Sequence, residues 1–513
     1  MKLRSGRTIL AASLALALAI LACGGPAATV APTAAPTSAP IQAPTQAPTQ
    51  APIPTIASTA TTASQATATT AAQQPTTAAT SAATAQATQA PLNTSGKLDL
   101  LGLSSYMDSS QSFHVVGLFS NGTNQPVKGV ELTLGLTDST GLSVLKDSNN
   151  QLTDTVTVNP MLDNIGAGQS SPFDYHLTVA TGVDTTGWKF KLDVTKNNPG
   201  DVSTADVQVT NDQTSVDSSG TVYLTGELVN KTNQPVQINE LAAAMLNGPD
   251  KPVAAGTLLA GTRILQATGD AQGSDRTPFV IDVSGPVLTG TTPAYYVDAV
   301  PATATDAATA NDIHLQLANT FVDGTNNVHV VASVTNSGTE TVTVRVVAGL
   351  YEKDGKVLDA SNEDVALYLA AGDTDPVGFS FFPSVNGNNA AIAKLDTYSV
   401  QIDPFWTFPT TSSIVNLQAT NVITSSLGAG SGEATIKGTV TNTTKKNLAN
   451  ASVVVAVLDP GGKLIATDYT VASPQSGAWT PGQKVDFQIT IQLPASVDPG
   501  AVTFLTKVQG TLP

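Results

Sequence analysis

Four copies of one sequence pattern follow one another from residue 97 to the end of the chain, and this repeat constrains the fold more than any other feature. Each copy opens on an alternating run with a small residue at its centre and an asparagine at its end. The small residues, spaced 109, 106 and 106 positions apart, are Gly117, Gly226, Ala332 and Gly438. A repeat of this length has the size of a whole domain, so the sequence predicts four similar domains in tandem.

The hydrophobic pattern within each copy has a period of two residues, as in β-strands, and no stretch sustains the period of a helix. A second strand ends in an acid or amide that begins a turn, at Asp138, Asn247, Glu352 and Asp459. A later strand carries an aromatic residue, at Phe173, Phe279, Phe379 and Phe487, and a last strand opens near Trp188, Tyr295, Tyr398 and Phe504. Domains of about 100 residues with many short strands are typical of immunoglobulin-like sandwiches. We therefore expect an all-β fold of four tandem immunoglobulin-like β-sandwiches.

The segment from Leu241 to Leu246 favours a helix when taken alone, since it contains three consecutive alanines. Its equivalents in the third and fourth copies, 346–350 and 453–458, are rich in β-branched residues, so the repeat predicts a strand here too. We also expect the small residue at the centre of each first strand to leave room for an aromatic side chain from the facing sheet.

Shifts in composition set the expected boundaries, at Pro199-Gly200, after Pro301, and between Pro404 and Ser412. The expected domains are 96–198, 199–302, 303–408 and 409–513, after a signal peptide at 1–22 and a linker at 23–95.

The end of the second strand carries a family resemblance. The segments Leu134-Gly135-Leu136-Thr137-Asp138, Ala348-Gly349-Leu350-Tyr351-Glu352 and Val455-Ala456-Val457-Leu458-Asp459 resemble the strand-end motif of bacterial FxLYD-type domains, although no copy has the full Phe-x-Leu-Tyr-Asp string. The Asn-Gln-Pro-Val before it in copies one and two is similar to that family as well. The resemblance covers 97–513 and implies small immunoglobulin-like modules on envelope proteins, without a catalytic site.

The start of the chain is typical of an exported lipoprotein. Positive residues precede an apolar run, Ile9 to Leu21, that is shorter than the roughly 20 residues of a membrane-spanning helix. The next feature resembles the lipobox that bacterial signal peptidase recognises, formed by Ile20, Leu21 and Ala22 before Cys23. The resemblance implies cleavage before Cys23 and an acyl lipid, such as palmitate, on it. We expect an extracytoplasmic protein anchored by that lipid to a bacterial membrane, at the cell surface or the periplasmic face.

The segment after the anchor has the composition of a disordered linker. No charged residue occurs from Thr8 to Gly96, and after Gly25 the sequence is mostly Ala, Pro, Thr, Gln and Ser. Such a chain cannot bury enough apolar surface to fold. About 70 residues of it span from about 50 Å as a coil to about 200 Å when extended, so its expected role is reach. Glycosylation of this Thr-rich linker stays open.

Charge and motif content exclude several functions. Without residues 1–22 the chain has 20 basic and 39 acidic residues, so nucleic acid is not an expected partner. Cys23 is the single cysteine, which leaves no intrachain disulfide. The sequence lacks a calcium loop, a nucleophile elbow, a phosphate-binding loop and a zinc-protease motif. We expect no metal, no cofactor and no enzymatic activity.

Three smaller features have competing interpretations. By alternation His114 and His329 lie on the outer face of the first strand, where we expect them to be solvated rather than catalytic or metal-ligating. Asn121, Asn230 and Asn442 occur in Asn-x-Thr, but Asn336, at the same place in copy three, does not, so turn formation explains all four asparagines and glycosylation only three.

The aromatic residues Phe405, Trp406 and Phe408 cluster at the boundary of the third domain. They form either a wedge that packs the third domain against the fourth or an exposed platform for a sugar or a protein.

The leading functional hypothesis is a non-enzymatic envelope protein whose sandwiches serve as spacers or binding modules, with an envelope protein or a glycan as partner. The alternatives are a structural component that assembles through sheet edges or self-association, and, less favoured, a solute-binding lipoprotein, which would need an α/β body.

Overall fold

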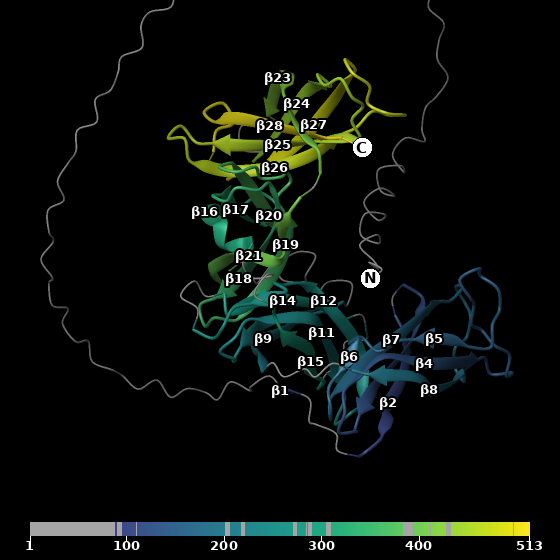
Figure 1. Ribbon diagram of the computed structural model, residues 1–513. Helices are drawn as coiled ribbons and strands as arrows, with labels where there is room; N and C mark the ends of the chain where they lie inside the picture. The colour runs from purple at the N-terminus through teal and green to yellow at the C-terminus, as the bar shows by residue number, and fades with distance from the viewer. Residues whose placement is uncertain are drawn as a thin grey trace, which may run out of the picture. The chain divides into compact units, whose positions relative to one another are not determined.

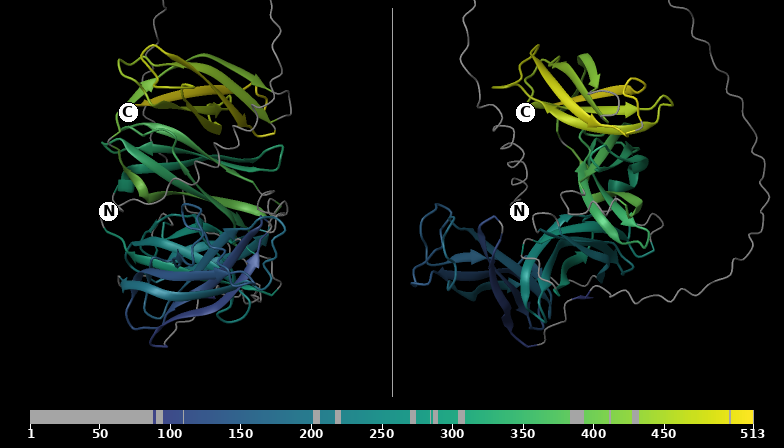
Figure 2. Two further views of the ribbon diagram at one scale, coloured as in Figure 1. Left: turned by 90° about the vertical axis from the view of Figure 1, so that its right-hand side faces the viewer. Right: turned by 180° about the vertical axis from the view of Figure 1, so that it is seen from behind.

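A computed structural model describes residues 88–89, 95–108, 110–200, 206–216, 221–269, 274–283, 285, 290–303, 309–382, 393–410, 412–426, 432–495 and 497–512. The predicted signal peptide, Cys23 and nearly all of the linker lie outside these residues. Within them the regular structure is β-strand, apart from the short 3-10 helix η1 (Thr309–Asp312), and no helix there has the length and apolarity needed to cross a membrane. The chain forms four tandem immunoglobulin-like β-sandwiches, which Figures 1 and 2 show in colours from blue to yellow.

Sandwiches 1 and 2 use the strands up to Pro301. Those of sandwich 1 are β2 (Leu98–Met107), β3 (Ser112–Asn121), β4 (Val127–Thr137), β5 (Val156–Val158), β6 (Asn164–Ile165), β7 (Ser170–Thr178) and β8 (Lys189–Pro199). Those of sandwich 2 are β9 (Val207–Val216), β10 (Val222–Asn230), β11 (Val236–Leu246), β12 (Pro252–Ala260), β13 (Ile264–Leu265), β14 (Arg276–Val283) and β15 (Thr292–Pro301). A further short strand, β1 (Thr88–Gln89), precedes them.

Sandwiches 3 and 4 repeat the arrangement. Sandwich 3 contains β16 (Ile313–Val322), β17 (Val328–Asn336), β18 (Val342–Glu352), β19 (Val357–Asp364), β20 (Thr374–Phe381) and β21 (Leu395–Pro409). Sandwich 4 contains β22 (Ile414–Leu417), β23 (Ala419–Ser426), β24 (Glu433–Thr441), β25 (Asn450–Leu458), β26 (Leu464–Ala472), β27 (Lys484–Gln492) and β28 (Thr503–Thr511).

Each sandwich has two sheets, which we call sheet I and sheet II. Sheet I is antiparallel and runs β2-β3-β7, β9-β10-β14, β16-β17-β20 and β23-β24-β27 in sandwiches 1 to 4. Sheet II is built around β4, β11, β18 and β25. In sandwich 2 the strand β12 pairs with both β11 and β14, so the two sheets are continuous there.

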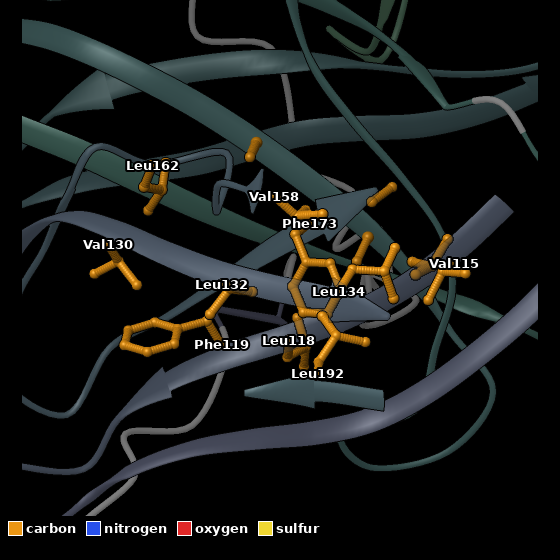
Figure 3. Close-up of a cluster of buried hydrophobic side chains, with 14 of the residues drawn as sticks. Val115, Leu118, Phe119, Val130, Leu132, Leu134, Val158, Leu162, Phe173 and Leu192 are labelled. Carbon is orange, nitrogen blue, oxygen red and sulfur yellow. The ribbon is translucent and has the colours of Figure 1, made fainter. Parts of the chain in front are cut away.

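The core of each sandwich lies between its two sheets, as alternation predicts. Figure 3 shows this for sandwich 1, where Phe119 and Phe173 from sheet I meet Leu132, Leu134 and Leu192 from sheet II. The segment from Leu241 to Leu246 is part of strand β11, so the repeat was a better guide there than helix propensity.

The small residue in the first long strand makes room for an aromatic ring, but the ring comes from a different place than expected. Gly117 pairs with Phe173 on the neighbouring strand of the same sheet, and a Cβ atom at Gly117 would lie 2.5 Å from that ring. Gly226 with Phe279 and Gly438 with Phe487 repeat this geometry. The prediction of a ring from the facing sheet was therefore wrong, because the phenylalanine bends along its own sheet over the glycine opposite.

The repeated asparagine closes the turn after each first long strand. Asn121, Asn230, Asn336 and Asn442 are each at most 1% exposed. In Asn442 the amide donates to Lys446 O (2.9 Å) and Trp479 O (2.8 Å), while its Oδ1 accepts Thr444 N (3.0 Å). The other three use equivalent partners. Turn formation is confirmed, and an N-linked sugar has no room because the amide nitrogen is buried and already donates.

Candidate functional site

The most regular feature outside the cores is a junction that occurs three times. In each, sheet I of one sandwich packs against sheet II of the next through the strand that follows the motif turn. At the first junction β12 packs against β2, β3 and β7. At the second, β19 packs against β9, β10 and β14, and at the third, β26 packs against β16, β17 and β20. The four sandwiches accordingly group as one compact unit.

The first junction explains the three alanines of β11. Leu241, Ala243 and Met245 point into the core of sandwich 2, whereas Ala242 and Ala244 belong to the apolar cluster of sandwich 1. Both faces of this strand are buried, and only small side chains let the two sheets approach. Ser104 Oγ also donates to Pro252 O (2.6 Å) across the junction.

Polar contacts hold the second and third junctions. At the second, Thr225 Oγ1 donates to Val357 O (2.5 Å), and Gln401 Nε2 donates to Thr262 Oγ1 (2.7 Å). At the third, the Gln509 side chain pairs with the backbone of Tyr368, accepting its N–H at 2.8 Å and donating to its carbonyl at 3.1 Å.

The strand that leads into the motif turn carries a small residue three positions before the turn in every copy, at Gly135, Ala244, Gly349 and Ala456. At Gly349 a Cβ atom would lie 2.6 Å from Pro278 of the preceding sandwich. At Gly135, in sandwich 1, the nearest atom to a Cβ would be Asp154 O of the same sandwich, at 3.6 Å. The small residue is therefore needed where a preceding sandwich packs.

The outer face of sheet I differs between stacked and terminal sandwiches. The central small residue of each first long strand pairs with a residue on the next strand of sheet I. The residue just before that pairing residue is proline in the three stacked sheets, at Pro172, Pro278 and Pro376. In sandwich 4 it is Asp486. The rest of that face in sandwich 4 includes Lys437, Gln488 and Thr490, all exposed. A polar outer face of this kind is typical of the capping unit of a repeat protein.

The two outer-face histidines are buried at these junctions, contrary to expectation. His114 is 4% exposed and His329 is 8% exposed. His114 stacks on Tyr106 at 4.5 Å and its Nδ1 lies 2.9 Å from Asp174 Oδ2. His329 stacks on Phe321 at 4.6 Å, and its Nε2 lies 3.0 Å from Asp323 Oδ2. Alternation gave the correct face, but that face of sheet I packs against another sandwich rather than facing water.

A cavity of about 280 Å³ lies at the third junction, between sandwich 3 and β26. Its lining includes His329, Glu363, Asp364, Asp468 and the exposed rings of Phe382 and Tyr469. Burial, with the nearby charges of Asp364 and Asp468, raises the pKa of Glu363 to about 7. In the described part of the chain no three His, Cys, Asp or Glu side chains are grouped as metal ligands.

The predicted aromatic cluster lies on a bulge of β21. Thr343 of β18 pairs with Phe408, but Arg345 pairs with Asp403, so the residues between them on β21 bulge outward. Phe405, Trp406 and Phe408 are 38%, 37% and 45% exposed.

Arg345 covers part of the bulge. Its guanidinium lies 4.7 Å from the centre of the Trp406 ring and makes two hydrogen bonds to Asp364, at 2.7 and 3.0 Å. The contacts of β21 outside its own sandwich include β13 of sandwich 2. The guanidinium of Arg345 therefore packs against the Trp406 ring as a cation–π contact, which favours one orientation of the ring.

Asp403 ties the base of this bulge to sandwich 2. Its side chain is 0% exposed, and its Oδ1 accepts Arg263 N (3.1 Å) and Phe405 N (3.2 Å). Its Oδ2 has no hydrogen-bond partner among the described residues. Burial raises the pKa of this carboxyl to about 6, against the lowering effect of the two N–H groups and of Arg345 and Arg263. Sequence reasoning missed Asp403, since nothing in its neighbourhood marks it as buried.

Cys23 and the lipobox residues Ile20, Leu21 and Ala22 lie outside the described residues. Their predicted roles stay predictions.

No protein-family model matches the chain, and no curated protein matches it. Among solved structures it is similar to native E. coli alpha-2-macroglobulin, with 11% identity over 83% of this chain and 30% of that one, at a TM-score of 0.12. Salmonella alpha-2-macroglobulin reacted with methylamine gives 12% identity, 82% and 28% coverage and a TM-score of 0.11. A calcium-binding mutant of Bacteroides uniformis beta-glucuronidase 2 gives 9% identity over 57% of this chain and 30% of that one, at a TM-score of 0.10. The chain thus spans less than a third of each of these, and scores this low carry no argument about function.

Proposed function

We propose that this protein is a lipid-anchored, non-enzymatic scaffold of the bacterial envelope, which holds a stack of immunoglobulin-like modules at a distance from the membrane. The observation that carries the proposal is the junction that repeats three times with the same face pairing. Freely jointed modules would need no such junction, whereas a spacer gains length and stiffness from it. The strand-end motifs support membership of the FxLYD-type modules.

The anchor in this proposal is the acyl lipid on Cys23. Cys23→Ala should move the protein from the membrane fraction to the soluble fraction and abolish labelling by radioactive palmitate. Gly24→Ala is the matched control, since it changes the neighbouring residue and leaves the cysteine, and it should keep both properties. Membrane retention and labelling of the Cys23→Ala protein would contradict the anchor.

The assembly alternative receives less support from the faces at the two ends of the stack. Sheet I of sandwich 4 is polar, and the outer face of sheet II in sandwich 1 carries Lys191, Asp193 and Lys196. Neither face resembles the apolar or proline-bearing faces of the three junctions. Sedimentation of the intact protein should accordingly show no growth with concentration, and growth would favour the assembly alternative.

The aromatic bulge supports a binding role for the scaffold. Three partly exposed rings on one bulge, with Trp406 oriented by Arg345, match the stacking surfaces that bind sugars or proteins. Binding of the intact protein to isolated cell-wall glycan should therefore fall in Trp406→Ala. Phe382→Ala is the matched control, because Phe382 is 49% exposed and directly follows β20 of sheet I in the same sandwich, whereas the bulge lies on β21 of sheet II. Equal binding by the two variants would contradict a platform at Trp406.

A further inference from the structure

In each sheet II the strand that closes the sandwich lies on one side of the central strand and so presents an outer edge. Unpaired edges of this kind can pair with other chains. The closing strands are β8, β15, β21 and β28. Their outer edges are protected in different ways.

Three of the four edges have a local protection. Strand β8 carries three lysines, at Lys189, Lys191 and Lys196, and ends in Pro199. The helix η1, at the entry to sandwich 3, lies against β21. In sandwich 4 the entering segment β22 pairs with β28, from Ile414 with Thr511 to Leu417 with Val508.

The edge of β15 has none of these. The strand contains no lysine or arginine, and its one charged residue, Asp298, is 1% exposed. Asp298 accepts hydrogen bonds from Asn164 and Asn239 rather than facing the edge as a free charge. The described part of sandwich 2 begins at 206 and enters sheet I directly with β9, so it gives β15 no equivalent of β22.

The strand that pairs with this edge lies far earlier in the sequence, at the end of the linker. Strand β1, Thr88–Gln89, pairs in parallel with β15, placing Thr88 opposite Ala294 and Gln89 opposite Tyr295. Residues 76–90 contain no proline, so every residue of this part of the linker has an N–H group to donate. Strand β1 therefore occupies the position along β15 that β22 occupies along β28. Strand β1 runs parallel to its partner, whereas β22 runs antiparallel.

We propose that the outer edge of β15 is a strand-acceptor site, and that its occupant is the end of the protein's own linker around Thr88–Gln89. Backbone hydrogen bonds then fasten the linker to sandwich 2 before the chain enters sandwich 1. The chain from Gln89, the end of β1, to Leu98, the start of β2, spans at most about 30 Å when fully extended. The two strands must therefore lie within that distance of each other. The linker thus covers the one closing-strand edge that has no local protection, and it moves the attachment point of the stack from sandwich 1 to sandwich 2.

The test is hydrogen exchange of the intact protein, read on peptides that cover Thr292–Pro301. The double variant Thr88→Pro/Gln89→Pro removes both N–H groups of β1 and lies outside every sandwich core. The matched control, Thr69→Pro/Thr70→Pro, places the same two prolines elsewhere in the linker. We expect the outer-edge amides of β15 to exchange about tenfold faster in the first variant, as the loss of one or two backbone hydrogen bonds implies, and at the wild-type rate in the control.

A synthetic peptide with the sequence of residues 81–94 should restore the slow exchange when added to the first variant, because it supplies the missing strand. Unchanged exchange at β15 in that variant would overturn the proposal, as would equal acceleration in the control. Peptides from β10 and β24 serve as internal references and should not change, which separates loss of the edge strand from loss of folding.

Discussion

The buried carboxyl of Asp403 makes the stability of sandwich 3 depend on pH. Burial at the second junction raises its pKa from 3.8 to about 6. Folding therefore favours the protonated form, so the contribution of this group is fully present below its unfolded pKa and is lost as pH rises through about 6. Two pKa units correspond to about 3 kcal/mol in total, of which about 1.4 kcal/mol is lost between pH 5 and pH 8. The side chain is 0% exposed, so solvent screening does not reduce this figure much.

Asp403→Asn removes the titration and keeps an oxygen that accepts from Arg263 N and Phe405 N. We expect the free energy of unfolding of the variant, relative to the wild type, to rise by about 1.4 kcal/mol between pH 5 and pH 8. Because four sandwiches do not unfold in one step, the measurement is hydrogen exchange of β18 and β21 across a urea series at both pH values. Asp396→Asn, an exposed carboxyl on the same strand, is the control.

The comparison between wild type and variant removes the effect of other titrating groups, such as Glu363, whose pKa is also raised. The reasoning is refuted if the difference between wild type and Asp403→Asn is the same at pH 5 and pH 8. It is also refuted if Asp396→Asn changes the difference as much.

Two further predictions concern the repeat. Asn336→Ala should lower the free energy of unfolding of sandwich 3 by about 3 kcal/mol, because Leu369 O, Glu340 O and Gly338 N lose their buried partner. Urea-dependent hydrogen exchange of β17 and β18 measures this change, with Ser337→Ala as the control. Ala244→Gln should open the first junction and enlarge the radius of gyration measured by small-angle scattering, whereas Gly135→Gln, at the equivalent position of the unstacked face, should leave it unchanged; equal profiles would show that the small residue is not needed for stacking.

The sequence predicted the parts of the fold that depend on one sandwich alone. Period-two alternation places Phe119 and Leu134 in a core whatever surrounds the sandwich, and the buried turn asparagines follow from four aligned positions. The repeat also predicted β11 as a strand, against the helix propensity of its three alanines.

The failures share one physical cause, which is that alternation identifies a face but not what covers it. His114 and His329 were assigned to the correct face, and the next sandwich covers that face. Asp403 gave no signal at all, because its burial depends on Arg263, which lies 140 positions away in the sequence. The signal for stacking was nevertheless present in the sequence, in the alanines of β11 and in the prolines at 172, 278 and 376.

The same residues explain why the four copies are not interchangeable. A sandwich in the middle of the stack needs a small residue on sheet II, for the sandwich before it, and a proline-bearing or apolar sheet I, for the sandwich after it. Sandwich 4 meets the first requirement with Ala456 and replaces the second with Asp486, whereas sandwich 1 has Pro172 on sheet I and charged side chains on sheet II. Moving sandwich 4 to an inner position would bury the charges of Lys437 and Asp486, although Asp486 accepts a hydrogen bond from Thr439 Oγ1 (2.7 Å), at a cost of several kcal/mol for each charge. The order of the copies is therefore set by their outer faces, although their cores are nearly equivalent.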